Sequence, residues 1–513
     1  MSVLGGWLVT TGYDVVVVGA GTAGCVLASR LSADPGRRVL LIEAGRRLTE
    51  PVIHRPGAWP LARLTEANWG ENTVTQASTG TSIPLARGRG LGGSSAINAM
   101  AFIRGHRSSY DRWVDEGASG WGFDDLLPFF KRSETAPRRD PALRGSGGPL
   151  YLAPALAPND WLRACSAAAA ACGHPAASDI CGGLEEGFGA LDNNIVGGAR
   201  QSAADAYLTG DMLSRPNLTV LPDAVVGRLR WAHGRCVGLD YRTGSGRSGT
   251  VGCLGEVVLC AGAVGSAALL MRSGVGPAGN LRALDIPVHG ELAGVGANLH
   301  DHPVSPLIYR PGARGAPPGR ANHAELVGLV RTCFAHGAPD VQVLFVDLPI
   351  PPPGFASVPA GFTIRPSIMN PISRGTVRLA TADPATPPLI DPNYYADPLD
   401  VARMREGLRM ARAIGEAAAL APWRGVELLP GPDIRDDHQL DDYVRRSLGS
   451  YSHPVGTCRM GTDSASVVDL RLRVHGVSGV RVADASIMPS IISANTNATV
   501  YAIAERAATM LTS

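Results

Sequence analysis

The sequence predicts an α/β fold, α+β overall, with a Rossmann-like dinucleotide-binding domain and a second domain. A strand, glycine-turn, helix and strand pattern begins at Tyr13, and an alternating pattern over Val341–Val346 lies between stretches rich in proline and glycine. The chain has 513 residues. One hydrophobic core is not expected to serve a chain of this length, so two or three domains are predicted.

The first element is a βαβ unit. A valine-rich run over Tyr13–Val18 predicts a strand, a helical stretch ends at Leu31, and a second apolar run over Arg38–Ile42 is followed by Glu43. The turn between strand and helix is Gly19-Ala20-Gly21-Thr22-Ala23-Gly24. Glycines at these spacings allow a tight turn, a pyrophosphate close to the backbone and close helix–strand packing, while free N–H groups at the helix start hold phosphates.

This pattern predicts a dinucleotide site with Gly19, Gly21, Thr22, Ala23 and Gly24 at the phosphates. The acidic residue at the end of the second strand, Glu43, is placed to accept hydrogen bonds from a ribose. The fingerprint alone does not separate FAD from NAD.

The later elements are less regular. Segments between Pro/Gly-rich stretches at 310–319 and 349–353 read as loops and strands of a second domain. The predicted strands are Leu218–Leu221, Val225–Trp231, Val257–Cys260 and Val341–Val346, and the predicted helices are Ser266–Arg272, Asp400–Ala418 and Asn495–Leu511.

Composition excludes several classes of protein. Hydrophobic residues make up 45%, charged residues 18%, and the net charge is +2, which argues against disorder and against a nucleic-acid partner. Lys131 is the only lysine among 47 basic residues, a usage that indicates a GC-rich bacterial genome. No apolar run reaches the ~18 residues of a membrane helix, and Met1–Gly12 lacks a signal-peptide pattern, so a cytoplasmic location is expected. Nine scattered cysteines without a CxxC pair argue against disulfides and a zinc site.

A second glycine-rich run, Gly88–Asn98, resembles the first signature of the glucose-methanol-choline (GMC) family of FAD-dependent oxidoreductases. Further blocks similar to those of the family follow in order, so that the resemblance extends from Tyr13 to about Thr509. These blocks are Arg200–Leu208, Gly262–Gly276, Gly296–Pro303, Ser373–Leu379, Asp391–Tyr394, Ser452–Gly461 and Asp484–Pro489.

The resemblance implies FAD as cofactor and a GMC-type fold. The expected division is an FAD-binding part over residues 13–299, interleaved with some segments of the substrate domain, a substrate-binding domain on an antiparallel sheet over 300–460, and a return to the FAD domain over 461–513. Further residues expected at FAD are Gly92, Ser94, Asn98, Ala101, Val226 and Asp484. Family members with covalent flavin carry a histidine where this chain has Ala96, so FAD is expected to be non-covalent.

His453 and Cys458, five residues apart, admit a metal site, a thiol nucleophile or a lone histidine base. Metal binding needs more converging ligands than this segment offers, and nothing local predicts a depressed thiol pKa. Imidazole can accept a proton at neutral pH, and the family's catalytic histidine falls at His453. Its family partner falls at Asn495, with Asn497 as a neighbour that could be confused with it. The other histidines, His302 among them, are assigned structural roles.

The implied reaction is oxidation of an alcohol to an aldehyde or ketone, with electrons passed to a non-oxygen acceptor such as a quinone or protein carrier. Tyr451, two residues before His453, favours this acceptor class if its ring occupies the approach of oxygen; a ring that points into the core, the commoner fate of a lone tyrosine, is the alternative. The alternatives are an alcohol oxidase using O₂, a hydroxynitrile lyase and a flavin-binding protein without catalysis. The chain is choline dehydrogenase-like, yet no acidic residue is placed to recognise choline; small or aromatic alcohols and a peptide-derived redox carrier are the other candidate substrates.

Overall fold

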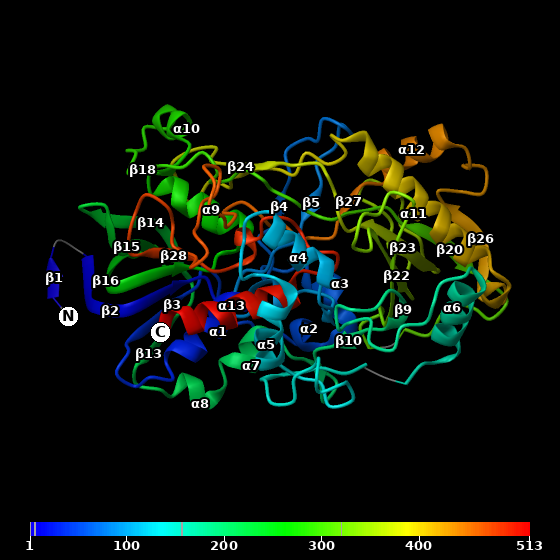
Figure 1. The fold of residues 1–513 in the computed structure, drawn as a ribbon, viewed down its shortest axis with the longest axis horizontal. Coiled ribbons are helices and arrows are strands. Elements are labelled where there is room, and N and C mark those ends of the chain that lie inside the picture. The colour runs from blue at the N-terminus through cyan, green and yellow to red at the C-terminus, as the bar shows by residue number, and fades with distance from the viewer. Residues whose placement is uncertain (1, 5–6, 155–156, 320, 513) are drawn as a thin grey trace.

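The first sheet is mainly parallel and combines strands from both ends of the chain. The structure is a computed structural model that describes residues 2–4, 7–154, 157–319 and 321–512. Parallel pairing connects β13 (Leu218–Leu221), β3 (Val39–Ile42), β2 (Trp7–Val18), β16 (Ser248–Leu259) and β28 (Val480–Val482) in that spatial order. The antiparallel strands β15 (Arg235–Thr243) and β14 (Ala224–Ala232) extend the sheet beyond β16. Because β28 lies beside β16, the C-terminal segment returns to the first domain (Figure 1).

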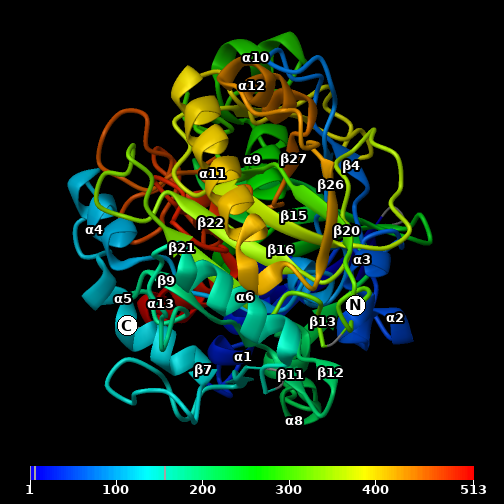
Figure 2. The same cartoon turned by 90° about the vertical axis from the view of Figure 1, so that its right-hand side faces the viewer.

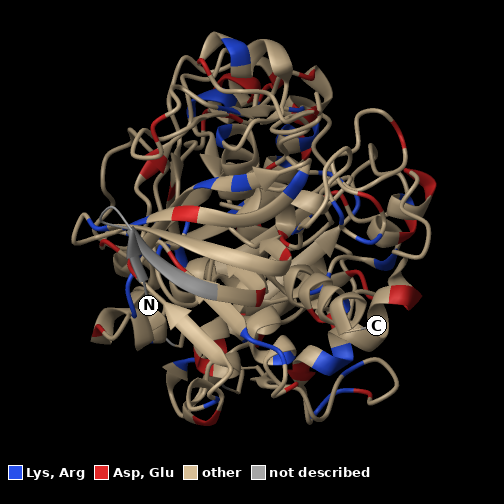
Figure 3. Cartoon of the chain, turned by 90° about the vertical axis from the view of Figure 1, so that its left-hand side faces the viewer, with Lys and Arg blue, Asp and Glu red and all other residues tan. Residues whose placement is uncertain are grey.

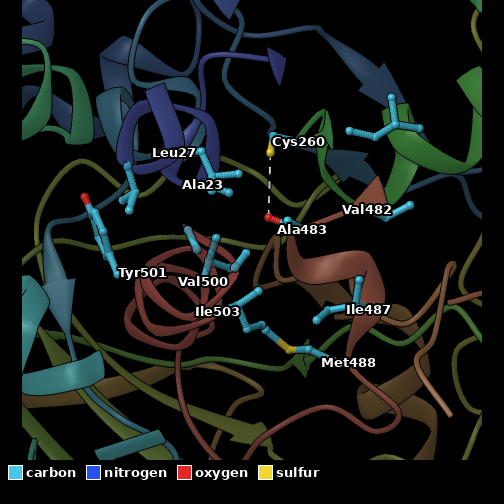
Figure 4. Packing of buried hydrophobic residues seen from close by; sticks show 14 of the residues in the cluster. Ala23, Leu27, Cys260, Val482, Ala483, Ile487, Met488, Val500, Tyr501 and Ile503 are labelled. Carbon is cyan, nitrogen blue, oxygen red and sulfur yellow. Dashed lines mark hydrogen bonds between the residues drawn. The ribbon is translucent and has the colours of Figure 1, made fainter. Parts of the chain in front are cut away.

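Two helices pack together against this sheet. Helix α1 (Thr22–Leu31) buries every residue except Arg30, and α13 (Asn497–Thr512) packs along it. Figure 4 shows Leu27 of α1 and Tyr501 and Ile503 of α13 in one apolar cluster. The fully buried Glu505 of α13 forms an ion pair with Arg30 at 2.7 Å. This pairing ties the C-terminal helix to the first βαβ unit.

The second sheet is antiparallel throughout, as the family resemblance implies. Its spatial order is β26 (Arg424–Leu429), β20 (Leu307–Pro311), β23 (Phe362–Ile368), β22 (Val341–Val346), β21 (Leu326–Val330) and β9 (Gly187–Ala190). Short strands β19 (Pro303–Val304) and β27 (Gly449–Ser450) join it beside β23. Helix α11 (Pro398–Glu416) crosses one face, as Figure 2 shows.

The two faces of the second sheet have different surroundings, because side chains alternate along a strand. Val343 and Phe345 of β22 share a core with Leu408 of α11. Leu344 and Val346 point to the opposite face, which lines a cavity between the two sheets.

The elements predicted from the sequence are confirmed, although several of them begin or end at other residues than predicted. β13 and β22 have the predicted bounds, while β16 begins at Ser248, well before the predicted Val257. Helix α9 (Gly262–Arg272) begins four residues before the predicted Ser266. The division at 299 and 460 stays a prediction; one strand of the second sheet, β9, comes from well before residue 299.

Among the described residues, no helix is both long and apolar enough to cross a membrane, and no cluster of three or more potential ligands could hold a metal ion. Positive and negative residues are interspersed on the side of the molecule seen in Figure 3.

Candidate active site

The two glycine-rich segments are in direct contact. A Cβ on Gly24 would lie 1.8 Å from the carbonyl oxygen of Gly19, so only glycine allows α1 to begin this close to β2. A Cβ on Gly93, whose φ is +52°, would lie 2.6 Å from the Cα of Gly21. The amide of Gly92 donates to the carbonyl of Ala20 at 2.8 Å. The second segment therefore closes over the first turn, where a phosphate would meet backbone and not side chains.

Glu43 lies at the end of β3, as the sequence predicts. Its buried carboxylate accepts hydrogen bonds from the amides of Ala20 at 2.7 Å, Gly45 at 2.8 Å and Gly90 at 3.0 Å. Burial raises the pKa of Glu43, and these hydrogen bonds act in the opposite direction. The carboxylate thus organises both glycine segments.

A cavity of about 490 Å³ runs from this turn to the second sheet. Most of the predicted cofactor residues line it, namely Gly19, Gly21, Thr22, Ala23, Glu43, Ser94, Asn98, Ala101, Val226 and Asp484. Gly24 and Gly92 do not line it; their roles are the close backbone contacts described above. The glycine turn, the start of α1 and the acidic Glu43 fit a dinucleotide at this end.

Several of the lining side chains already have partners. Asn98 Oδ1 accepts from Arg200 Nη1 at 2.8 Å. Asp484 accepts from Ser266 Oγ and Ser486 Oγ, both at 2.6 Å, so its carboxylate connects α9 to the C-terminal segment. Ser94 Oγ accepts from the Gly88 amide at 3.1 Å. Ser94 is exposed and lines the cavity.

His453 and Asn495 meet at the other end of the cavity. Asn495 Nδ2 lies 3.3 Å from His453 Nε2, and Asn495 Oδ1 accepts from Gln342 Nε2 at 3.2 Å. Asn497 instead accepts from Thr22 Oγ1 at 2.7 Å, at the start of α13. The two asparagines that the sequence leaves open are therefore separated in space, and Asn495 is the one at His453.

His302 is the residue that sequence reasoning missed. Its Nδ1 lies 2.9 Å from His453 Nδ1, although the sequence analysis assigns it only a structural role. The buried carboxylate of Asp301 accepts from the backbone amides of His302 at 2.8 Å and His453 at 2.7 Å. His302 and His453 are about 150 residues apart in the chain, so no local pattern in the sequence could indicate that they are in contact. Only the family block Gly296–Pro303 marks the segment that contains His302.

Burial lowers the pKa of both histidines. His302 is lowered to about 3, mainly by burial and against two carbonyl contacts that raise it. The pKa of His453 lies well below its usual range because of burial; repulsion from His302 when that ring is protonated, and from the cations Arg63 and Arg365, adds to the effect. Both imidazoles are therefore neutral at physiological pH.

Tyr451 is buried, and it also lines the cavity. Its ring stacks on that of His453 with centroids 4.9 Å apart and planes 10° apart. The Arg365 guanidinium lies over the Tyr451 ring, 5.0 Å from its centroid. The Tyr451 ring thus contacts both a cation and the histidine.

Cys458 is a fully buried residue, and burial raises the pKa of its thiol. A thiolate is disfavoured there. The geometry therefore gives no support to a nucleophilic cysteine beside His453.

The comparisons with known proteins agree with this site. Residues 13–304 and 371–504 match the N- and C-terminal domains of GMC oxidoreductase. Mitochondrial choline dehydrogenase of Mus musculus is 38% identical, with 97% of this chain and 89% of the relative covered. Alcohol dehydrogenase [acceptor] of Pseudomonas putida is 37% identical, with 97% and 95% covered.

Solved structures agree as well. Pyridoxine 4-oxidase from Mesorbium loti superposes with a TM-score of 0.91 at 38% identity, with 97% of this chain and 99% of that chain covered. With a dinucleotide cradle at one end of the cavity, a buried histidine at the other and matches over nearly the whole length, this chain belongs to the GMC oxidoreductases and is an FAD-dependent oxidoreductase of alcohols.

Proposed function

We propose that this enzyme oxidises its alcohol at the His453 end of the cavity, where His453 takes the hydroxyl proton and Asn495 orients the hydroxyl oxygen. Bound FAD supplies the two-electron acceptor for the hydride that leaves the carbon. The observation that carries the proposal is the hydrogen-bond chain through His302, His453 and Asn495. The contacts of His302 determine which atom donates and which accepts in each of these hydrogen bonds.

His302 Nε2 lies 3.2 Å from the carbonyl oxygen of Met369 and 3.1 Å from that of Ile492. Carbonyl oxygens only accept, so this nitrogen carries the proton of the neutral ring. His302 Nδ1 must then be the acceptor in its contact with His453, and His453 Nδ1 the donor. His453 Nε2 is then unprotonated and its lone pair accepts from Asn495 Nδ2; an unprotonated nitrogen is the form a general base requires.

Asn495 complements this lone pair. Gln342 donates to Asn495 Oδ1, which turns the Asn495 amide nitrogen toward His453 Nε2. A substrate hydroxyl between the two would donate to His453 Nε2 and accept from Asn495 Nδ2. The amide does not compete for the proton, so each residue has one task.

We also propose that FAD is held non-covalently and that a quinone or protein carrier, not oxygen, takes the electrons. The stacked Tyr451 ring beside His453 supports the second point because it fills space next to the reacting end of the cavity. The similarity to an alcohol dehydrogenase [acceptor] favours it, whereas the similarity to pyridoxine 4-oxidase favours an oxidase.

Anaerobic mixing of the holoenzyme with a panel of alcohols tests the proposal. Bleaching of the flavin absorbance supports alcohol oxidation. Cleavage of a cyanohydrin with the flavin still oxidised would support a lyase instead. Subsequent mixing with air-saturated buffer or with a quinone compares acceptors; reoxidation by oxygen at the rate of turnover would contradict the non-oxygen acceptor.

A further inference from the structure

Two arginines line the substrate end of the cavity, and neither has a carboxylate partner among the residues that the structure describes. Arg63 follows the short helix α3 (Trp59–Ala62), and Arg365 lies in the middle of β23. Arg365 is directly opposite Leu344 of β22, so both side chains lie on the face of the sheet that lines the cavity. The segments that carry the two arginines are about 300 residues apart in the chain, and the fold brings them to one wall.

Both guanidiniums contact aromatic rings near the proposed base. Arg365 lies 5.0 Å from the centre of the Tyr451 ring, which stacks on His453, and Arg63 lies 4.6 Å from the Trp59 ring. Cation–π contacts hold a guanidinium in place but leave its N–H donors available. The buried Nε of Arg63 and the buried hydroxyl of Tyr451 have no hydrogen-bond partner within the described part of the chain.

The acidic residues of the same cavity have other partners. Glu43 accepts from three backbone amides, Glu71 forms an ion pair with Arg87, and Asp484 accepts from Ser266 and Ser486. In the described ranges, no carboxylate forms an ion pair with Arg63 or Arg365, and none contributes to the pKa of either. The pKa of Arg63 is lowered to about 10 by burial and by Arg365, so the residue is still cationic at neutral pH.

Two partly buried cations on one cavity wall are costly unless an anion accompanies them. The phosphates of FAD have their own place at the glycine turn and the start of α1, at the far end of the cavity. The two positive charges without a counter-ion in the described residues therefore lie at the substrate end of the cavity.

We propose that Arg63, Arg365 and the Tyr451 hydroxyl bind an anionic group, a carboxylate or a phosphate, on the alcohol substrate. The inference rests on the proposed function, since it concerns the alcohol that reaches His453. Guanidinium groups bind such anions through paired charge-assisted hydrogen bonds. The same charges repel a quaternary ammonium, so the enzyme is not selective for choline despite its similarity to choline dehydrogenases.

Matched alcohols that differ only in charge test the proposal. Under anaerobic conditions, 4-(hydroxymethyl)benzoate and 4-(hydroxymethyl)phenyl phosphate are compared with 4-(hydroxymethyl)benzamide and with choline. The wild-type enzyme should reduce its flavin with one of the anionic alcohols at least about 10-fold more efficiently than with the amide. Comparison of the carboxylate with the phosphate identifies which anion the site takes.

Variants then assign the preference to the two arginines. Arg365→Gln and Arg63→Gln should each lower the ratio of kcat/KM for the anionic alcohol to kcat/KM for the amide roughly 10- to 100-fold. Arg310→Gln is the matched control, because Arg310 is exposed on β20 of the same sheet. The flavin absorbance of each variant verifies that the holoenzyme has formed.

Binding without reaction separates this proposal from the proposed function. Benzoate and inorganic phosphate are titrated into the oxidised holoenzyme, and the flavin spectrum is recorded. If no alcohol reduces the flavin, the proposed function fails, yet tight binding of either anion that weakens in Arg365→Gln still supports the site. Equal use of the amide and the anionic alcohols, a preference that persists in both variants, or the absence of anion binding would overturn the proposal.

Discussion

His302 and His453 are joined through their Nδ1 atoms, 2.9 Å apart, with their ring planes at 90°. Because His302 Nε2 faces two carbonyl oxygens, the polarity of this contact is fixed from outside the cavity. Asp301 holds the backbone amides of both residues, so one buried carboxylate sets the distance between the rings. The arrangement makes His302 a positioning residue for the proposed base.

Substitutions of His302 test this role. His302→Leu removes the acceptor for His453 Nδ1–H and should slow flavin reduction by roughly 10- to 100-fold, the usual effect of losing a partner that orients a functional histidine. His302→Gln can accept from His453 through Oε1 and donate to the carbonyls through Nε2, so most of the rate should return. Stopped-flow absorbance measures both variants; equal losses in two correctly folded variants would contradict the tautomer assignment.

Substitution of His453 itself has a larger expected effect. His453→Ala should retain the bound-flavin spectrum but slow flavin reduction by roughly 10² to 10⁴, the usual contribution of a general base. Asn495→Ala should cost less, because it removes a hydrogen bond and not the proton acceptor. Cys458→Ser is the control for the neighbouring thiol: damage as severe as that of His453→Ala, with the fold intact, would return the cysteine to consideration.

The sequence allowed the fold to be predicted because its signals are local. The valine run of β2, the glycine turn and the acid after β3 are all contained in one continuous segment, Tyr13–Glu43, and the structure has them as expected. Val341–Val346 could be recognised as a strand from its alternation alone. Such patterns depend on neighbours in the chain, which a single sequence displays.

The partners around His453 depend on tertiary packing and had no such signal. His302 and Arg365 reach the site from β-sheet segments distant in the chain, and a lone histidine or arginine in a strand pattern is usually structural. The choice between Asn495 and Asn497 likewise depends on the path of the chain before α13, where a shift of two residues changes the partner from His453 to Thr22. Only the folded chain separates these cases.

The contact between the two glycine segments predicts a steric defect in a single variant. Gly93→Ala places a methyl group 2.6 Å from the Cα of Gly21 and adds the strain of a positive φ, about 1–3 kcal/mol before any backbone shift. Loss of FAD affinity and of stability should follow. Gly234→Ala shares the positive φ, at +73°, but meets no atom within 4 Å, so it should bind FAD normally. Flavin content after purification compares them, and equal flavin content would contradict the steric argument.

Non-covalent attachment of FAD is tested by acid precipitation. Ala96 is buried and offers no nucleophile where covalent family members carry histidine. Yellow colour should remain in the supernatant after the protein is precipitated. A yellow pellet would mean that another residue forms a bond to the flavin.

The last prediction concerns pH and follows from the charges around His453. The neutral ring is the active form, so the rate of flavin reduction should fall only when acid protonates it. Burial and the charges of Arg63 and Arg365 lower the pKa of His453 well below the ordinary value of 6.5, so the acid limb should lie below pH 6.5.

Removing a positive neighbour of His453 makes protonation of its ring easier, which raises that pKa. Arg63→Gln or Arg365→Gln should therefore move the acid limb to higher pH. Tyr451, which contacts both Arg365 and His453, carries no compensating charge, because burial raises its pKa to about 12. Rates of reduction by an uncharged alcohol, measured anaerobically from about pH 4.5 to 9, give the profiles, and Arg310→Gln should leave the limb in place. An acid limb at or above 6.5 in the wild type, or one that moves to lower pH in the two variants, would contradict the assignment of His453 as a base under the influence of these arginines.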